Sequence, residues 1–345
     1  MAEPRGKRVL AWVQRVLPWA SLAVGIVGAL MMDRGPARGA IVAGVALASW
    51  FVLMLVMWLE RIHEARVAAH QGDPAETAPG VRIVRGARFS TLMLVQSSIH
   101  LQLYFALPFY FSAFAGTLAQ SAFMALLCLA ALASLWDPLT EWLLVHTRMG
   151  LLLPAFASFA VMAAVLPGLG LSNTAALWAA TGAGALALPV LVFADRVRGR
   201  RLATTIVLAV VVAAVLPVAL LLGAARLVPA VPMKLVTAAV GTRRAGYEVV
   251  DATDRLARVP ARLVCATAIF APLGVRERLW HVWRHDGLVV DRILLEIRGG
   301  REDGFRTYSV KQNFGDAPAG HWSCAVETSL GQFLGERTLV IEPAS

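Results

Sequence analysis

Residues 279–287, LWHVWRHDG, place two tryptophans, two histidines and an aspartate within nine positions. Successive side chains of a β-strand point to opposite faces, so one face of such a strand would carry Leu279, His281, Trp283 and His285. The pair Asp286-Gly287 is typical of a tight hairpin turn and ends the strand. The stretch therefore predicts a strand followed by a turn.

Three interpretations of this stretch are open: a strand over a core, a metal site and a binding surface. In a strand, His281 and His285 are about 13 Å apart at about 3.3 Å per residue, whereas each zinc ligand must lie about 2 Å from the ion. We therefore expect no metal site from these two histidines alone. A strand with one face on the core is the simplest interpretation. Exposed rings beside polar groups would instead suit a sugar or a peptide, with His281, Trp283 and His285 as the contacts.

Short runs rich in β-branched and aromatic residues surround this stretch, and Gly, Pro and Asp clusters separate them. The runs predict strands near residues 247–252, 261–270, 278–284, 289–298, 304–310, 321–328 and 337–341. About seven short strands in roughly 100 residues are typical of an immunoglobulin-like β-sandwich. We expect this domain to cover residues 242–345, after a linker over residues 228–241.

Two cysteines support the sandwich. Cys265 and Cys324 both fall in predicted strands, and in an oxidising compartment they can form one disulfide between the sheets or stay as two thiols. Immunoglobulin domains have a tryptophan between the two cysteines and a tyrosine two residues before the second one. Here Trp322 stands in the place of that tyrosine, which leaves the immunoglobulin relationship open.

A basic group surrounds the turn RGGREDGFR and consists of Arg298, Arg301 and Arg306. These arginines could meet an anionic partner or lipid headgroups. A solvated hairpin is the simpler interpretation.

The first two thirds of the chain have the composition of a membrane protein. The chain is 58% apolar and 16% charged, with a mean hydropathy of +0.66, whereas soluble domains carry about 25% charged residues. A membrane-spanning helix needs about 20 mainly apolar residues. Seven runs approach this length: Val16–Met32, Gly39–Leu59, Thr91–Phe114, Gly116–Trp136, Gly150–Leu171, Thr174–Ala194 and Leu202–Leu227. The sequence thus predicts a polytopic α-helical membrane region over residues 1–227, with a cytoplasmic linker over residues 60–90.

The net charge of +10 follows from membrane topology rather than from nucleic-acid binding, because basic residues gather at the ends of apolar runs. Examples are Arg5, Lys7, Arg8, Arg82, Arg85, Arg88, Arg196, Arg198, Arg200 and Arg201. With the N-terminus in the cytoplasm, seven spans place the C-terminal domain on the outer side of the membrane. The expected partners are the lipid bilayer and an envelope protein or a glycan.

A polar helix face interrupts the third apolar run. Gln96, His100 and Tyr104 recur every four residues and would share one face of a helix. Ionisable groups inside a membrane helix are candidates for function, although hydrogen bonds between helices are the simpler interpretation. The common motifs of nucleotide-binding and hydrolytic enzymes are absent from the sequence, and it predicts neither a cofactor nor a metal.

Several short patterns in the last 100 residues resemble a bacterial family of unknown function, DUF2914. They are Cys265-x-Thr267-x-Ile269, HVW at 281–283, GGR at 299–301, FRTYS at 305–309, GHW at 320–322 and GQFLG at 331–335. The resemblance implies an envelope location and a small β domain after a multi-span region. It implies no activity and no site residues.

The sequence therefore predicts an envelope protein, not an enzyme, whose periplasmic β-sandwich binds a partner. One alternative is a membrane enzyme or transporter that uses the Gln96–His100–Tyr104 face. A second alternative is an envelope sensor, which would need a separate cytoplasmic partner.

Overall fold

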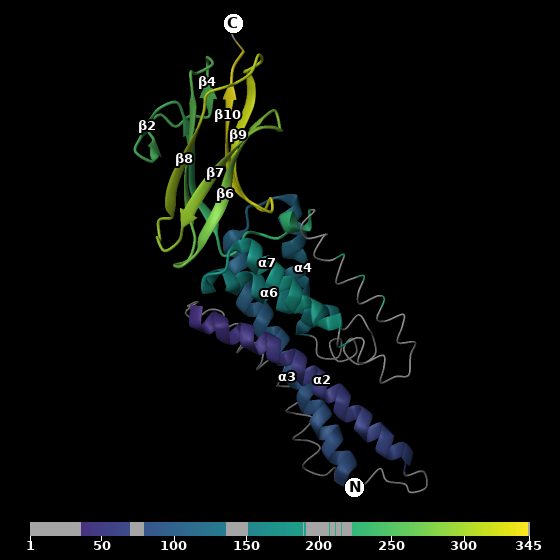
Figure 1. Cartoon of the computed structure of the whole chain (residues 1–345). Helices are drawn as coiled ribbons and strands as arrows, with labels where there is room; N and C mark the ends of the chain where they lie inside the picture. The colour runs from purple at the N-terminus through teal and green to yellow at the C-terminus, as the bar shows by residue number, and fades with distance from the viewer. Residues whose placement is uncertain are drawn as a thin grey trace, which may run out of the picture. The chain divides into compact units, whose positions relative to one another are not determined.

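The computed structural model describes residues 36–69, 79–135, 151–188 and 223–343, together with the single positions 190, 207, 211 and 215 (Figure 1). The chain divides into two compact units. The helical unit comprises Met1–Pro108, Leu126–Met162 and Leu177–Val218. The sandwich unit comprises Phe109–Ala125, Ala163–Ala176 and Ala219–Ser345. Two short segments from the part of the chain before the strands thus belong to the same unit as the strands.

The described helices are built mainly from alanine, leucine and other strong helix formers. They are α2 (Pro36–Ala69), α3 (Pro79–Ala113), α4 (Leu118–Ser134), α6 (Leu152–Val165) and α7 (Asn173–Ala185), with the short 3-10 helices η3 (Leu166–Leu169) and η4 (Ala224–Leu227). Proline occupies the first position of α2 and of α3, where the missing N–H would have no helical partner. Ser172 caps α7, because its hydroxyl accepts a hydrogen bond from the N–H of Ala175 at 3.2 Å.

The prediction of about seven membrane spans, and with it the multi-pass architecture, is wrong. The described part of the chain contains five α-helices, and one helical stretch in it, Leu152–Leu169, is long and apolar enough to cross a membrane. Two shorter apolar stretches are Gly39–Leu55 and Leu118–Ser134. The expected span Val16–Met32 lies outside the described residues, as does most of Leu202–Leu227.

The error arises because a run of apolar residues does not define where a helix begins or ends. The run Thr91–Phe114 is only the second part of α3, whose first turns contain Arg82, Arg85 and Arg88. The predicted linker over residues 60–90 is likewise helical at both ends, because α2 continues to Ala69 and α3 begins at Pro79. Its middle, residues 70–78, lies outside the described residues.

The C-terminal part is a two-sheet β-sandwich, as predicted. Its strands are β1 (Lys234–Gly241), β2 (Arg244–Ala245), β3 (Glu248–Val249), β4 (Arg255–Leu256), β5 (Leu263–Phe270), β6 (Arg276–His285), β7 (Leu288–Arg298), β8 (Phe305–Lys311), β9 (Gly320–Thr328) and β10 (Phe333–Ile341). One sheet has the order β1-β5-β8 and the other has the order β4-β10-β9-β6-β7, and β2 and β3 form a separate hairpin. The immunoglobulin-like relationship stays a prediction.

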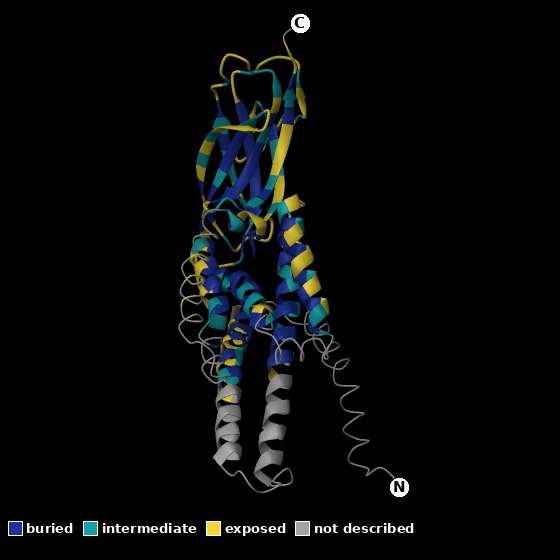
Figure 2. Ribbon diagram, turned by 90° about the vertical axis from the view of Figure 1, so that its right-hand side faces the viewer, coloured by how far each residue is buried: buried dark blue, intermediate teal, exposed yellow. Residues whose placement is uncertain are grey.

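Alternation of side chains explains why these segments form strands with one buried face. Along β6, Leu279 and Trp283 point into the sandwich and have no exposed surface, whereas Arg276 and Arg278 are exposed. From the facing sheet, Leu263, Cys265 and Ile269 of β5 fill the interior, and β5 is buried on its other face as well. Figure 2 shows this buried interior between the strands, with exposed positions concentrated on the outer faces and loops.

Strand β1 was not expected, because residues 228–241 were predicted to be a linker. Lys234–Gly241 instead pairs antiparallel with β5, from Lys234 opposite Phe270 to Gly241 opposite Val264. The linker prediction is therefore wrong, and the sandwich begins before residue 242.

Candidate functional site

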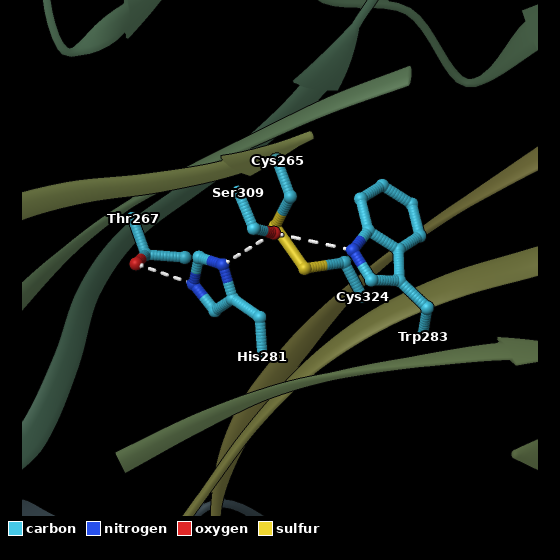
Figure 3. Close-up of a disulfide and its surroundings, with 6 residues drawn as sticks. All are labelled: Cys265, Thr267, His281, Trp283, Ser309 and Cys324. Atoms are coloured by element: carbon cyan, nitrogen blue, oxygen red, sulfur yellow. Dashed lines mark hydrogen bonds between the residues drawn. A yellow bond between two sulfur atoms is a disulfide. The ribbon is translucent and has the colours of Figure 1, made fainter. Parts of the chain in front are cut away.

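A disulfide joins the two sheets of the sandwich. It connects Cys265 of β5 with Cys324 of β9, and the two Cα atoms lie 6.4 Å apart (Figure 3). Trp283 of β6 is the direct cross-strand partner of Cys324. Both cysteines and the tryptophan are fully buried, so the bridge belongs to the core of the domain.

His281 lies beside this disulfide and is also fully buried. One ring nitrogen is 2.9 Å from the hydroxyl of Thr267 and the other is 2.8 Å from the hydroxyl of Ser309. The indole N–H of Trp283 donates to the same Ser309 oxygen at 3.1 Å (Figure 3). Burial lowers the pKa of His281 to about 4, so the ring is neutral at physiological pH, with one nitrogen donating and the other accepting.

These contacts distinguish between the three interpretations of LWHVWRHDG. The stretch is a strand whose tryptophan and first histidine face the core, so neither His281 nor Trp283 can touch a partner of the folded domain. The predicted binding role of these two side chains is corrected to a structural role. Atoms of Cys265, His281 and Cys324 that could ligate a metal lie within 4.8 Å of one another, but the disulfide removes the thiolates that a metal requires.

His285 supports the end of the same strand. Its ring stacks on Trp322 with 4.6 Å between centroids, and its Nε2 lies 2.9 Å from the carbonyl oxygen of Ala319. The next residue, Asp286, has a φ of 46° in the turn and accepts a hydrogen bond from the N–H of His321 at 2.8 Å. His285 and Asp286 thus hold the loop before β9 against the β6–β7 turn.

The three arginines of the predicted basic group do not act together. Arg306 forms an ion pair with Glu248 at 2.5 Å, and Arg301 lies over the ring of Phe305 with 5.7 Å to its centroid. Arg298 lines a different cleft, opposite Arg276 of β6. Of the three arginines, Arg306 lies at a concave surface beside aromatic rings.

That surface is a cleft of about 490 Å³ on the outer face of the three-stranded sheet, called here the hairpin cleft. Its floor consists of small side chains that lie opposite each other on β1 and β5: Thr237 with Ala268, and Ala239 with Ala266. The partners of these alanines on β8 are large, because Ala266 faces Tyr308 and Ala268 faces Arg306. Small residues beside large ones leave a trough along the sheet.

The β2–β3 hairpin forms the other wall of this cleft. The ring of Tyr247 packs against Tyr308 with 5.8 Å between centroids, and the guanidinium of Arg244 lies 4.2 Å from the centre of the Tyr308 ring. Glu248 reaches Arg306 through the ion pair. The hairpin therefore bridges to β8 and encloses the trough between them.

The lining of the hairpin cleft combines ring faces with charged and hydroxyl groups. Tyr247 is 58% exposed, and Asp303, Glu248 and Arg306 supply both signs of charge. The described residues that line it include no histidine, cysteine or serine, so its chemistry suits hydrogen bonding and stacking.

Sequence reasoning found Arg306 but missed Tyr247, Glu248 and Asp303. The outward alanines at positions 266 and 268 were the available signal, because alternate small residues in a strand leave room for something else. These alanines indicate a cleft only once the β2–β3 hairpin is known to fold over them.

The polar helix face belongs to the helical unit and is largely buried. His100 is hydrogen-bonded to the carbonyl oxygen of Ser134, and the hydroxyl of Tyr104 donates to Ala131 at 3.4 Å. A second chain of bonds runs from Trp50 to Ser158 at 3.1 Å and from Ser158 to Gln102 at 3.2 Å. Gln96 is buried as well. These contacts join helices to each other, and a transport or catalytic role for this face stays a prediction.

Comparison with known proteins gives two family matches. A model described as a family of unknown function, DUF5924, matches residues 4–271, which is more than half of the chain. A model described as a protein of unknown function, DUF2914, matches residues 276–339 and confirms the predicted resemblance. No curated protein and no solved structure matches the chain. The boundary between the two matched regions falls inside the sandwich, between β5 and β6.

Proposed function

The chain belongs to the family of unknown function DUF5924, and we propose that it is a membrane-attached binding protein of the bacterial envelope. In this proposal the helical part holds the protein at the plasma membrane, with the N-terminus in the cytoplasm. The β-sandwich lies in the periplasm and binds a glycan in the hairpin cleft.

The hairpin cleft is the observation that carries the binding role. The outer face of a sheet ordinarily meets solvent directly, whereas this face has a floor of small side chains and a hairpin clasped over it. Concave sites with a few convergent polar groups are where proteins bind small ligands. The volume of about 490 Å³ lies within the range of such sites.

The lining chemistry favours a glycan over an apolar ligand. A sugar presents hydroxyl groups around a ring and an apolar ring face. Glu248 and Asp303 can accept hydrogen bonds from hydroxyls, and Arg306 can donate to them. The exposed ring of Tyr247 offers a flat apolar face with a polar tip.

Two observations support the location. Disulfides persist in oxidising compartments such as the periplasm and are rare in the cytoplasm, and Cys265–Cys324 is buried in the domain core. The described helices also expose many large apolar side chains, among them Ile41, Phe51, Leu55, Leu94, Leu126, Leu129 and Leu132. Such extensive apolar surface is typical of contact with lipid.

The binding test uses the full chain in lipid nanodiscs, titrated with soluble fragments of bacterial cell-wall glycan. Ala268→Met should fill the floor of the cleft and weaken binding at least about tenfold, since the added side chain occupies ligand space. The matched control is Ala252→Met, at an exposed loop position outside the cleft. Equal glycan affinity in Ala268→Met and wild type would contradict the proposal. If the protein bound an envelope protein but no glycan, the proposed ligand would be a protein and not a glycan.

The location test uses cysteine labelling in a Cys128→Ser background. Glu302→Cys lies in the exposed β7–β8 turn, so a membrane-impermeant maleimide should label it in intact spheroplasts. Cys265 and Cys324 do not compete, because they are buried and bonded to each other. Labelling of residue 302 only after lysis would place the domain in the cytoplasm and overturn the proposed location.

A further inference from the structure

A second cleft in the sandwich unit, called here the arginine cleft, lies where β6 begins and β7 ends. Its volume is about 440 Å³. Ser172 and Thr174, at the start of α7, line it together with Ser329. The charged lining residues are Arg276, Glu277, Arg278, Glu296 and Arg298.

Two of these arginines are placed opposite each other. Arg276 of β6 and Arg298 of β7 are direct cross-strand partners, and both are exposed. Like charges opposite each other destabilise a pair of strands. Among the described residues, neither arginine has an ion pair. An anion held between the two guanidinium groups would remove this repulsion.

The two acidic residues of the cleft have partners other than Arg276 and Arg298. Glu296 lies 3.8 Å from Arg278 in an exposed ion pair. The carboxylate of Glu277 is almost fully buried and accepts a hydrogen bond from the N–H of Asn173 at 2.5 Å. The start of α7 is thus already occupied by Glu277, and Arg276 and Arg298 are the groups available to an anion.

The neighbourhood of the cleft is apolar on the side of the helical segment. Leu169 and Leu171 are exposed directly before Ser172. An arginine pair beside exposed leucines matches a molecule that is anionic at one end and apolar at the other. Guanidinium groups bind phosphate oxygens through paired N–H donors.

From this arrangement we infer that the arginine cleft binds the phosphate of an anionic phospholipid headgroup between Arg276 and Arg298. The inference rests on the proposed membrane attachment of the protein, and it assigns a site that is distinct from the hairpin cleft. Ser172 and Thr174 line the same cleft, and their hydroxyl groups can donate to headgroup oxygens.

The test measures retained lipid by native mass spectrometry of the full chain, released from nanodiscs that contain equal phosphatidylglycerol and phosphatidylcholine. The wild type should keep phosphatidylglycerol in preference to phosphatidylcholine. In Arg276→Gln/Arg298→Gln the ratio of retained phosphatidylglycerol to phosphatidylcholine should fall at least about tenfold. Each arginine near a lipid surface raises the affinity for an anionic lipid about fivefold. Arg276→Lys/Arg298→Lys, which keeps the charge without the planar fork, should retain part of it.

The matched control removes the same charge from another part of the domain. Arg255→Gln/Arg258→Gln changes two exposed arginines at and after β4, a strand that pairs with the last residues of β10. This control should keep the wild-type preference. Circular dichroism of each variant verifies that the sandwich is folded.

Three outcomes would overturn the inference. They are equal retention of both lipids by the wild type, unchanged preference in Arg276→Gln/Arg298→Gln, and displacement of phosphatidylglycerol by millimolar inorganic phosphate, which would make the site one for free phosphate. Glycan binding at the hairpin cleft and labelling of residue 302 are separate readouts. Failure of the lipid site is therefore distinguishable from failure of the proposed function.

Discussion

Tyr247 lies against Tyr308 with 5.8 Å between ring centroids, and this contact ties the β2–β3 hairpin to strand β8 across the hairpin cleft. Tyr308 also lies under the guanidinium of Arg244, 4.2 Å from the ring centre. One tyrosine of the sheet therefore anchors two residues of the hairpin. The outer wall of the cleft depends on it.

Replacing this anchor should loosen the hairpin without unfolding the domain. Tyr308→Ala removes a ring pair of about 0.5–1.5 kcal/mol and a cation–π contact of about 0.5–1 kcal/mol, both on the outside of the sandwich. Amide hydrogen exchange over residues 244–249 should accelerate, while exchange in β5 and β6 stays slow. The control is Tyr247→Phe, which keeps the ring and should leave exchange unchanged. Slow exchange at 244–249 in Tyr308→Ala would show that other contacts hold the hairpin.

Neutral His281 should make the stability of the sandwich depend on pH. Its pKa is lowered from 6.5 to about 4 by burial, so below pH 6.5 the unfolded chain binds a proton that the folded domain does not. Stability is full above about pH 6.5 and is lost as pH falls toward 4, by up to about 3 kcal/mol in total. Chemical denaturation at pH 7 and at pH 4.5 measures the difference.

Two variants isolate this effect. His281→Gln removes the titrating group and should flatten the dependence between pH 4.5 and 6.5, at a lower overall stability because Thr267 or Ser309 loses a buried partner. Burial raises the pKa of Glu277, which favours the folded state at low pH and opposes the His281 effect. Measurements in a Glu277→Gln background therefore show the histidine alone. An unchanged slope in His281→Gln would refute this assignment.

The Cys265–Cys324 bridge should contribute substantially to stability. It closes a loop of 59 residues, for which the loss of chain entropy in the unfolded state corresponds to about 4 kcal/mol. Cys265→Ala/Cys324→Ala should lower the free energy of unfolding by a comparable amount in denaturant titrations. Cys128→Ser, which changes the one free cysteine in the described part of the chain, serves as the control. A loss below about 1 kcal/mol would show that the core packing alone holds the sheets together.

Strand β1 should be required for an independently folded sandwich. It pairs along β5 and buries Val240 in the core around the disulfide. A fragment of residues 223–345 should therefore show a cooperative thermal transition, whereas a fragment of residues 242–345 should show none or a transition many degrees lower. Equal transitions in the two fragments would mean that β1 is dispensable.

The sequence predicted those strands whose pattern is local. LWHVWRHDG shows both the alternation of β6 and its turn, and the sequence placed Cys265 and Cys324 in strands that the structure joins by a disulfide. The sequence does not show which face of β6 lies on the core. Trp280 and Val282 on the outer side are as apolar as Leu279 and Trp283 on the inner side. Only the facing sheet distinguishes the two sides.

Features that depend on long-range pairing were not predictable. Strand β1 follows an apolar run and contains two adjacent alanines, so it lacks a strong strand pattern, and its pairing with β5 decides its structure. The hairpin cleft needs β1, β5, β8 and the β2–β3 hairpin to meet, and no single segment carries that information. The prediction of membrane spans from apolar runs failed for a related reason. Composition does not determine where a helix begins and ends, as α3 shows.

The boundary between the two family matches divides the β-sandwich between two separate regions of the chain. Cys265 and the whole β1–β5 pair lie in the region matched by DUF5924, whereas Cys324 and the main sheet strands β6, β7 and β9 lie in the region matched by DUF2914. Of the facing sheet, only β8 lies in the second region, so without the first region β1 and β5 would be missing and most of the inner side with Leu279 and Trp283 would be uncovered. In this chain the second region is thus an incomplete sandwich, and strands β1 and β5 from the first region complete it.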